Sequence, residues 1–151
     1  MKEISYGTVL PVPVDEAFEF VSEPANWPLF FESMRSVERQ EGWGKVGGRA
    51  HVVISLLGRA VTSEFELTEW DPPRSFRYIA RQQGWPDLDN NRVFEPVGTG
   101  TRLRFVTAAE GRPGPMALVD WLYRRALLRT FRRAMARLPR VVRRTHQEAP
   151  Q

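Results

Sequence analysis

The sequence predicts an α+β domain in which a curved antiparallel sheet of about seven strands is covered by a long C-terminal helix. Two patterns carry this prediction. Residues 115–138 repeat apolar side chains at the helical period of about 3.6 residues. Residues 36–109 instead alternate polar and apolar side chains, as strands do. A single amphipathic helix has to bury its apolar side, so we expect it to cover one face of the sheet.

The N-terminal segment predicts one strand followed by two short helices. Residues 4–10 alternate well enough for a strand, and the proline-rich segment after them ends it. Two acidic residues suit the start of a short helix over residues 15–21, which Pro24 ends. Residues 26–31 then predict a second short turn of helix that presents a dense aromatic cluster.

Six further strands are expected between residues 36 and 109, and short turns rich in glycine and proline separate them. Turns of this length are typical of hairpins, so the strands should form an antiparallel meander. Residues 60–67 alternate cleanly, which predicts one covered face and one wet face. The expected strands are residues 36–41, 49–57, 60–70, 75–82, 90–96 and 101–109.

The long helix is expected to begin at Pro115 and to stop or kink at Pro139. Proline at the first helical position lacks an amide that would have no intrahelical partner anyway, whereas an internal proline removes a hydrogen bond. We expect residues 1–144 to form a single domain and residues 145–151 to be a disordered tail. The predicted apolar side consists of Met116, Val119, Tyr123, Leu127, Phe131, Ala134 and Leu138, widened by Trp121, Leu128 and Met135.

The composition predicts a soluble protein of the cytoplasm. The 151 residues are 42% hydrophobic, which fits a folded globule. There is no cysteine, so disulfides, thiolate nucleophiles and cysteine zinc sites are excluded, and a reducing compartment is compatible. The first residues contain no apolar block of the signal-peptide type, and no apolar run is long enough to span a membrane.

Positive charge is concentrated in the C-terminal helix. Residues 1–120 hold 13 Lys and Arg against 17 Asp and Glu, whereas residues 121–151 hold nine arginines against Glu148 alone. A solvated helix face would explain these arginines, which also suit the C-terminal end of the helix dipole. The alternative is a phosphate-bearing partner. The nearby Leu118 and Leu122 favour an anionic membrane surface or a homodimer contact over nucleic acid.

Four local strings of the sequence carry a resemblance to a known superfamily. They are Pro-Val-Asp-Glu-Ala-Phe at residues 13–18, Pro-Ala-Asn-Trp-Pro at 24–28, Glu-Trp-Asp-Pro-Pro-Arg at 69–74, and Phe-Glu-Pro-Val-Gly-Thr-Gly-Thr-Arg-Leu at 94–103. With the order of the expected elements, they make nearly the whole chain similar to the polyketide cyclase/dehydrase and lipid-transport superfamily, also called START-like or SRPBCC. The resemblance implies a helix-grip fold with a deep apolar cavity between the curved sheet and the C-terminal helix.

The resemblance places a set of aromatic and aliphatic residues around the implied cavity. Aromatic residues of the strands should face the helix, and those of the second short helix should lie near one rim. For any single one of them a core position is the simpler interpretation, because most buried aromatic side chains fill volume. The residues expected to contact a hydrophobic ligand are Trp27, Phe31, Phe65, Phe94, Phe105, Tyr123, Leu127 and Phe131.

Polar residues on covered faces are more informative, because an unsatisfied buried polar group costs about 1–3 kcal/mol. Alternation places Asn90 and Arg92 on the same side as Phe94, where the arginine could bind a carboxylate or enolate oxygen. Tyr78 offers a hydroxyl between Phe76 and Ala80. The other polar candidates, which could instead reach water at the rim, are His51, Ser55 and Thr107.

No sequence signal indicates a cofactor or a metal, and we expect neither. Residues 42–47 match the dinucleotide-binding string G-x-G-x-x-G, but a strand-like segment follows where that motif needs a helix. We interpret these residues as a hairpin loop. The histidines, His51 and His146, give a metal site little support because it would need mostly carboxylates.

Three functions are compatible with these features. The first is binding of a small hydrophobic or polycyclic ligand, lipid-like or polyketide-like, in the cavity. The second is a cofactor-independent polyketide cyclase or dehydratase, in which Arg92 would stabilise an enolate and Tyr78 or His51 would carry the proton. The third is an interaction module that uses the arginine-rich helix, whose binding would weaken with salt.

Overall fold

A seven-stranded antiparallel sheet carries the fold in the computed structural model, which describes residues 3–109 and 111–148. The strands lie in the order β1-β7-β6-β5-β4-β3-β2. The elements along the chain are β1 (Ile4–Leu10), α1 (Val14–Ser22), the 3-10 helix η1 (Pro24–Leu29), β2 (Met34–Glu41), β3 (Arg49–Leu56), β4 (Arg59–Asp71), β5 (Ser75–Gln82), β6 (Leu88–Val97), β7 (Gly100–Ala108) and α2 (Met116–Glu148).

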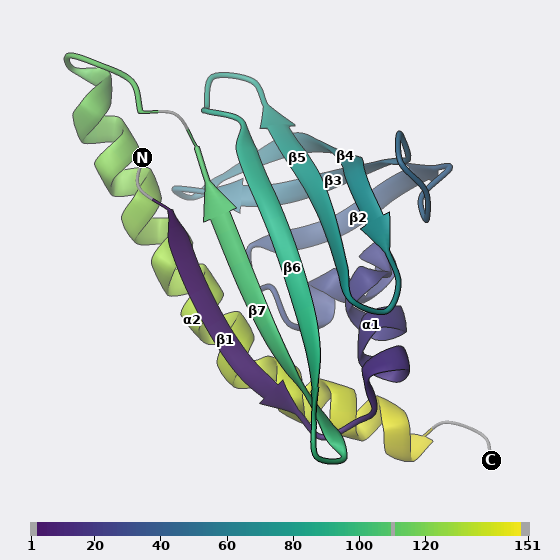
Figure 1. Ribbon diagram of the computed structural model, residues 1–151. Helices are drawn as coiled ribbons and strands as arrows, with labels where there is room; N and C mark the ends of the chain where they lie inside the picture. Colours follow the sequence, from purple (N-terminus) through teal and green to yellow (C-terminus); the bar gives the residue numbers. More distant parts are fainter. Residues whose placement is uncertain (1–2, 110, 149–151) are drawn as a thin grey trace.

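The sheet is a meander from β2 to β7, and β1 closes it by pairing with β7. It is strongly twisted, so that β2, β3 and β4 cross behind the strands of the other half (Figure 1). Helix α2 runs alongside β1 and covers the concave side, whereas α1 lies toward the other end of the sheet. The expected α+β helix-grip arrangement is confirmed.

Alternation along the central strands separates the two faces of the sheet. In β5, Phe76, Tyr78 and Ala80 are buried, whereas the intervening Arg77 and Arg81 lie on the outer face. Strands β6 and β7 follow the same period of two, as expected for a sheet with one covered face. The buried inward residues of these two strands are Leu88, Asn90, Arg92, Phe94, Thr101, Leu103, Phe105 and Thr107.

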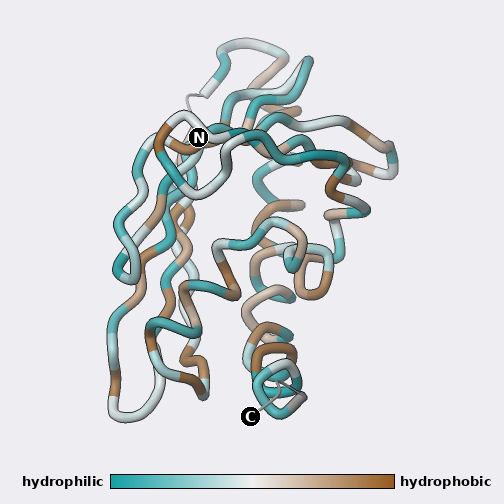
Figure 2. The backbone as a smooth tube through the Cα atoms, turned by 90° about the vertical axis from the view of Figure 1, so that its right-hand side faces the viewer, coloured by the Kyte–Doolittle hydropathy of each residue, from teal (hydrophilic) through white to brown (hydrophobic). Residues whose placement is uncertain are grey.

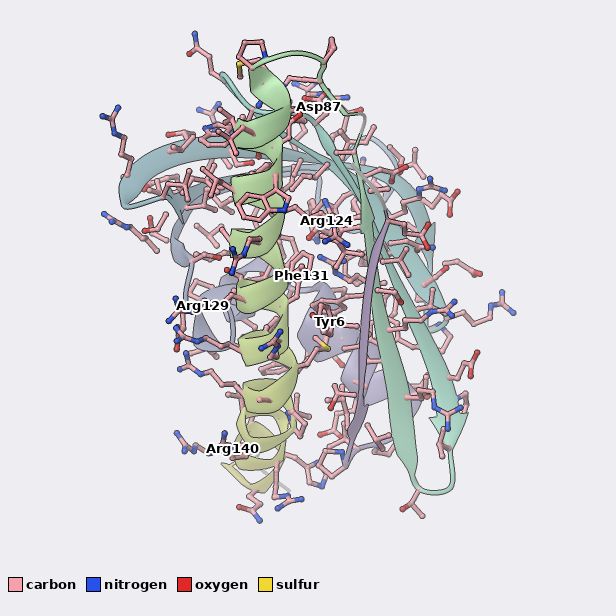
Figure 3. All side chains as sticks on the ribbon, turned by 90° about the vertical axis from the view of Figure 1, so that its left-hand side faces the viewer. Tyr6, Asp87, Arg124, Arg129, Phe131 and Arg140 are labelled. Atoms are coloured by element: carbon pink, nitrogen blue, oxygen red, sulfur yellow. The ribbon has the colours of Figure 1, made fainter. Side chains whose placement is uncertain are left out.

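Helix α2 is amphipathic along its length, and hydrophobic and hydrophilic stretches alternate along its coil (Figure 2). Phe131 lies on the side toward β1, and Arg129 and Arg140 lie on the other side (Figure 3). The expected stop at Pro139 is wrong, because the helix continues to Glu148. Tertiary contacts explain this: Val142 is buried, and His146 bonds Glu16 of α1.

Two further expectations about this helix need correction. Residues 145–148 of the expected disordered tail are helical, and the rest of that tail lies outside the described residues. Met116 and Trp121 were placed on the buried side, yet 38% and 51% of their surface is exposed. The reason is that the first turns of α2 extend beyond the end of β7 (Figure 1).

An ion pair anchors these projecting turns. The backbone amide of Arg112 donates to Asp120 Oδ2 at 2.9 Å, and its Nε donates to Oδ1 at 2.8 Å. A further bond runs from Arg112 Nη1 to the carbonyl of Gly84. Beside this pair, the ring of Trp85 packs on Tyr123 with centroids 4.8 Å apart. The start of α2 is therefore tied to the β5–β6 loop.

Replacing Asp120 with asparagine should loosen this anchor and lower the free energy of unfolding by about 1 kcal/mol at neutral pH. Hydrogen bonds from Arg112 hold the pKa of Asp120 below its usual range. The contribution of a carboxylate with a lowered pKa is present at neutral pH and is lost as the pH falls through that pKa. Urea unfolding at a series of pH values should thus show the difference from wild type shrinking below about pH 4.

Asp71→Asn is the matched control, because Asp71 pairs with Arg74 in an exposed ion pair. Exposed pairs contribute little, so this variant should unfold at nearly the same urea concentration as wild type. An Asp120→Asn variant as stable as the Asp71→Asn variant would show that the ion pair does not anchor α2.

Candidate functional site

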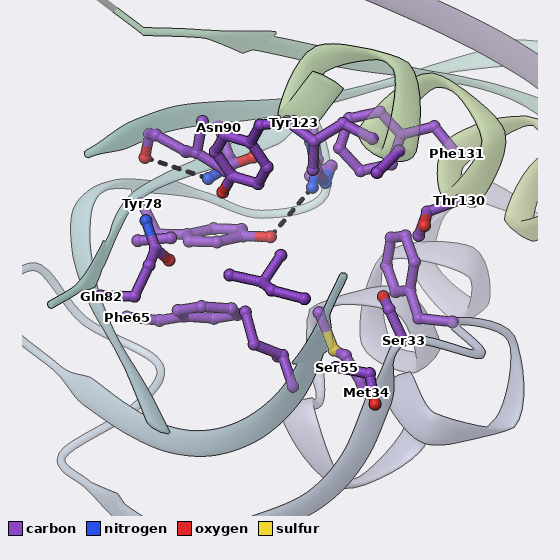
Figure 4. Close-up of a pocket in the computed structure, with 18 residues that line it drawn as sticks. Ser33, Met34, Ser55, Phe65, Tyr78, Gln82, Asn90, Tyr123, Thr130 and Phe131 are labelled. Carbon is purple, nitrogen blue, oxygen red and sulfur yellow. Dashed lines mark hydrogen bonds between the residues drawn. The ribbon is translucent and has the colours of Figure 1, made fainter. Parts of the chain in front are cut away.

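A cavity lies between the concave face of the sheet and the middle of α2 (Figure 4). Its volume is about 70 Å³, enough for several water molecules and too little for a polycyclic ring system. Most of the lining is apolar, and the polar groups come from a few side chains. The lining residues are Phe31, Ser33, Met34, Ile54, Ser55, Leu56, Phe65, Tyr78, Ala80, Gln82, Leu88, Asn90, Arg92, Tyr123, Ala126, Leu127, Thr130 and Phe131.

Stacked aromatic rings explain why the cavity is small. The rings of Tyr78, Trp27 and Phe65 contact one another, with centroids 4.9–5.6 Å apart. Tyr78 is also stacked against Phe76. Trp27 is fixed in turn by a hydrogen bond from its Nε1 to the carbonyl of Val21. Much of the concavity is thus filled by a rigid aromatic wall, and the remaining space lies between this wall and α2.

Arg92 is a buried cation at the wall of this cavity. Its side chain is 2% exposed, its Nη2 donates to the hydroxyl of Tyr78 at 2.9 Å, and its Nη1 reaches the carbonyl of Asn91 at 3.3 Å. The guanidinium carbon lies 3.9 Å from the ring centroid of Phe105. No carboxylate of the described residues lies within ion-pair distance of it.

The charge of Arg92 is therefore buried without an opposite charge. Burial lowers the pKa of Arg92, but a guanidinium group stays protonated in proteins. Its planar fork has five N–H donors, and the two hydrogen bonds leave most of them unused. An uncompensated buried charge is costly, and the ring of Phe105 offsets only part of that cost. The arrangement can bind an anionic oxygen that enters the cavity.

Tyr123 supplies a second polar group without a partner. Its hydroxyl is buried and makes no hydrogen bond to any described residue. Burial raises the pKa of Tyr123, so the phenol is neutral at physiological pH and can donate or accept a hydrogen bond. Tyr123 of α2 and Arg92 of β6 line the same cavity from its two sides, so a ligand with two oxygens could engage both.

Two other polar side chains of the cavity, those of Asn90 and Gln82, already have hydrogen-bond partners. Asn90 accepts from Thr107 Oγ1 at 2.8 Å and donates to the carbonyl of Leu88. Gln82 accepts from Ser63 at 3.0 Å and donates to the carbonyl of Pro86. These groups shape the wall and hold its strands together, whereas Arg92 and Tyr123 keep hydrogen-bonding capacity for a ligand.

The structure brings most of the sequence-predicted residues to this cavity and shows what the others contact instead. Trp27 lies behind the wall on Tyr78, and Phe105 supports Arg92. Phe94 packs against Phe18 of α1, at the other end of the concave face. The predicted residues that line the cavity are Phe31, Ser55, Phe65, Tyr78, Asn90, Arg92, Tyr123, Leu127 and Phe131, and Thr107 reaches it only through Asn90.

His51 does not line the cavity, so its expected role as proton carrier is not available there. It pairs in register with Glu64 on the outer face of the sheet. The neighbours of His51 in β3, Ala50 and Val52, point inward and are fully buried. Residues 52–54 are apolar at three successive positions, which weakens the alternation that would have placed His51 on the outer face.

Sequence reasoning missed several lining residues. Gln82 could have been found, because it continues the alternation of Phe76, Tyr78 and Ala80. Ala126 and Thr130 lie one helical turn apart on α2, beside the large apolar residues. Small side chains there leave room between helix and sheet, a signal that a search for large apolar residues overlooks.

Removing the two tyrosine hydroxyls should have opposite effects on stability. Tyr123→Phe deletes a buried hydroxyl without a partner, so the free energy of unfolding should stay the same or rise by up to about 1 kcal/mol. Tyr78→Phe deletes the acceptor of Arg92 Nη2 and should lower it by about 1–3 kcal/mol. Chemical denaturation of both variants measures this. If both variants lost the same free energy of unfolding, the hydroxyl of Tyr123 would have a hydrogen-bond partner in solution.

The sequence matches the family model described as polyketide cyclase / dehydrase and lipid transport over residues 1–143. The chain belongs to this family. The superfamily expected from the local strings is thus confirmed. Among curated proteins, none matches the chain.

Solved structures similar to this polyketide cyclase/dehydrase family member agree with its fold. TTHA0849 from Thermus thermophilus has a TM-score of 0.75 at 19% identity, with 95% of this chain and 99% of that chain covered. CV1439 from Chromobacterium violaceum has a TM-score of 0.72 at 17% identity, with 93% and 97% covered. The di-domain ARO/CYC BexL from the BE-7585A biosynthetic pathway has a TM-score of 0.73 at 23% identity, with 95% and 47% covered.

Two further observations concern metal ligands and membrane-spanning helices in this family member. Within residues 3–109 and 111–148, no three side chains of His, Cys, Asp or Glu gather as metal ligands would. In the same part of the chain, no helix has the length and apolar character needed to cross a membrane.

Proposed function

We propose that the protein binds a small, largely apolar ligand, lipid-like or polyketide-like, that carries an acidic oxygen. The uncompensated charge of Arg92 is the observation that carries this proposal. A carboxylate, enolate or phenolate oxygen would pair with the free donors of the guanidinium and remove the cost of the buried charge. The neutral hydroxyl of Tyr123 would bond a second oxygen of the same ligand.

The size of the cavity determines how such a ligand would lie. A volume of about 70 Å³ accommodates one end of a ligand, not a complete polycyclic molecule. The acidic end would enter and reach Arg92, and the apolar remainder would extend between Leu127 of α2 and Ile54 of β3, which both line the cavity. A larger ligand would require α2 to shift away from the sheet.

Paired ligands with the same skeleton test the proposal. Isothermal titration calorimetry of dodecanoic acid and its methyl ester changes only the acidic group. We expect the acid to bind at least about thirtyfold more tightly, because a buried charge pair that loses one partner costs about 2–5 kcal/mol. A second pair, naphthoic acid and its methyl ester, tests a ring system. Equal affinities within both pairs would contradict the assigned role of Arg92.

Cofactor-independent cyclisation of a polyketide is the second candidate, and the Arg92–Tyr78 pair favours it. A cation beside a hydroxyl could polarise a carbonyl and donate a proton. Burial raises the pKa of Tyr78, although Arg92 opposes this effect, so the hydroxyl is a proton donor and a poor base. The related fold of BexL, described as an ARO/CYC protein, supports the same class.

A poly-β-ketone analogue tests cyclisation. Turnover should be lost in Arg92→Met and strongly reduced in Tyr78→Phe, whereas His51→Gln should leave the rate unchanged because His51 lies on the outer face. Turnover that is retained in both cavity variants would exclude this pair as the catalytic groups.

A further inference from the structure

Exposed apolar side chains gather at the start of α2. The exposed fractions are 63% for Leu118, 51% for Trp121 and 43% for Leu122. Trp121 and Leu122 follow Leu118 by three and four residues, so both side chains lie on the same side of the helix as Leu118. Leu57, at the tip of the β3–β4 hairpin, is 54% exposed and lines a surface groove together with Leu122. We call Leu57, Leu118, Trp121 and Leu122 the mouth patch.

The backbone at Leu57 adds an independent observation. Leu57 has a φ of 49° and Gly58 a φ of 83°, so both central residues of this two-residue turn are left-handed. Such turns strongly prefer Asn, Asp or Gly, because a left-handed backbone is unfavourable for a branched apolar side chain. This leucine is strained, more than half exposed and not part of the hydrophobic core, which points to a role outside the folded chain.

Cationic side chains border the mouth patch. The guanidinium of Arg125 lies 4.9 Å from the ring centroid of Trp121. Arg125, Arg129 and Arg132 line the groove of Leu57 and Leu122, and no carboxylate of the described residues is within ion-pair distance of them. Arg133 lines the same groove but pairs with Glu32, so its charge is partly neutralised.

This combination of side chains indicates what the surface contacts. Leucine and tryptophan beside unpaired arginines are typical of surfaces that lie in the interface of an anionic bilayer, where apolar side chains enter the acyl region and cations bind phosphate groups. A nucleic acid would use the arginines but would leave Leu118 and Leu57 in water. A second copy packed symmetrically on the patch would bring the same arginines against one another.

We propose that the mouth patch and Arg125, Arg129 and Arg132 dock the protein onto an anionic lipid membrane. Ala126 lines both the groove of the patch and the ligand cavity, and Leu56 of the cavity wall precedes Leu57. A docked protein would therefore hold this side of its cavity next to the bilayer. Transfer of a ligand by this route rests on the proposed function, whereas docking itself does not.

Vesicle flotation tests the docking without any ligand. The full chain is mixed with vesicles of phosphatidylcholine, or of phosphatidylcholine and phosphatidylglycerol, at low and at raised ionic strength. We expect binding to be at least about tenfold stronger on the anionic vesicles and to weaken with salt. Failure to float with anionic vesicles at low salt would overturn the proposal and would leave the ligand cavity unaffected.

Variants separate the two components of the surface. Arg125→Gln with Arg129→Gln should reduce binding about tenfold or more, because each arginine near an anionic surface contributes about fivefold. Leu118→Ser with Trp121→Ser should reduce binding to a similar extent without changing the salt dependence. The controls are Arg104→Gln and Val46→Ser, which change exposed residues elsewhere and should bind as wild type.

Two other outcomes would show that this surface binds something other than a membrane. Tighter binding to a mixed-sequence oligonucleotide than to anionic vesicles, unaffected by Leu118→Ser and Trp121→Ser, would indicate a nucleic acid. A dimer in analytical ultracentrifugation that those same changes dissociate would indicate a second copy of the chain. Either result would contradict the proposed membrane contact. All the substituted residues are exposed, so we expect the variants to fold normally.

Discussion

Replacing Arg92 with methionine should abolish the binding of acidic ligands and, at the same time, stabilise the unliganded protein. Methionine has a similar length and fills the same space beside Phe105 without burying a charge. Exchanging buried charges for apolar side chains of similar volume is neutral or stabilising by about 1–4 kcal/mol. The loss of the hydrogen bond to Tyr78 offsets about 1 kcal/mol of this gain.

In Arg92→Met the hydroxyl of Tyr78 has lost its hydrogen-bond donor. The double variant Arg92→Met with Tyr78→Phe also removes this hydroxyl and should be more stable than Arg92→Met alone. The free energies of unfolding come from urea denaturation, and ligand affinities come from calorimetry with the acid and ester pairs. We expect the affinity for the acids to fall by more than about thirtyfold and the affinity for the esters to stay within a few-fold. A gain in stability together with a loss of affinity would show that Arg92 is retained for binding.

Arg104→Met is the matched control for this substitution. Arg104 is exposed on the outer face of β7, and its replacement should change the free energy of unfolding by no more than about 0.5 kcal/mol. If Arg92→Met were instead the less stable of the two by several kcal/mol, the buried guanidinium would be a structural group. The acidic-ligand proposal would then lose its main support.

Filling the cavity from the helix side should block the ligand without unfolding the protein. Ala126 lines the cavity, and leucine is almost as good a helix former as alanine. The larger side chain in Ala126→Leu would occupy much of the 70 Å³ and should raise the free energy of unfolding by up to about 2 kcal/mol. The affinity for both the acid and the ester should fall at least about tenfold, because the lost space is needed by both.

The same substitution at Ala136 provides the comparison, since Ala136 lies on the exposed side of α2. Ala136→Leu should leave both stability and affinity near the values of the wild type. If Ala126→Leu retains full affinity, the ligand does not occupy this cavity, and a site elsewhere would have to be sought.

Strand positions and the fold were predictable because the local signals agree with one another. Residues 4–10 and 75–82 were assigned with the observed bounds, since alternation is clear in both segments and turns flank them. The inward position of Arg92 followed from the same alternation. These features depend on the two-residue alternation of side chains along a strand, which the sequence shows directly.

Other features depend on packing between distant segments, which periodicity does not report. The end of α2 beyond Pro139 is held by Val142 and His146 against other parts of the chain. The size of the cavity is set by the stacking of Trp27, Tyr78 and Phe65, which are far apart in sequence. The free hydroxyl of Tyr123 is visible only once its surroundings are known.

The pairing of β1 with β7 has a consequence for synthesis on the ribosome. Ile4 lies opposite Thr107, so the earliest strand to be made can find its neighbour only after more than a hundred further residues have been translated. At roughly 5–20 residues per second, this wait lasts roughly 5–20 s. Nascent chains stalled before β7 should therefore remain open to protease along β1, and protection should appear once translation has passed that strand.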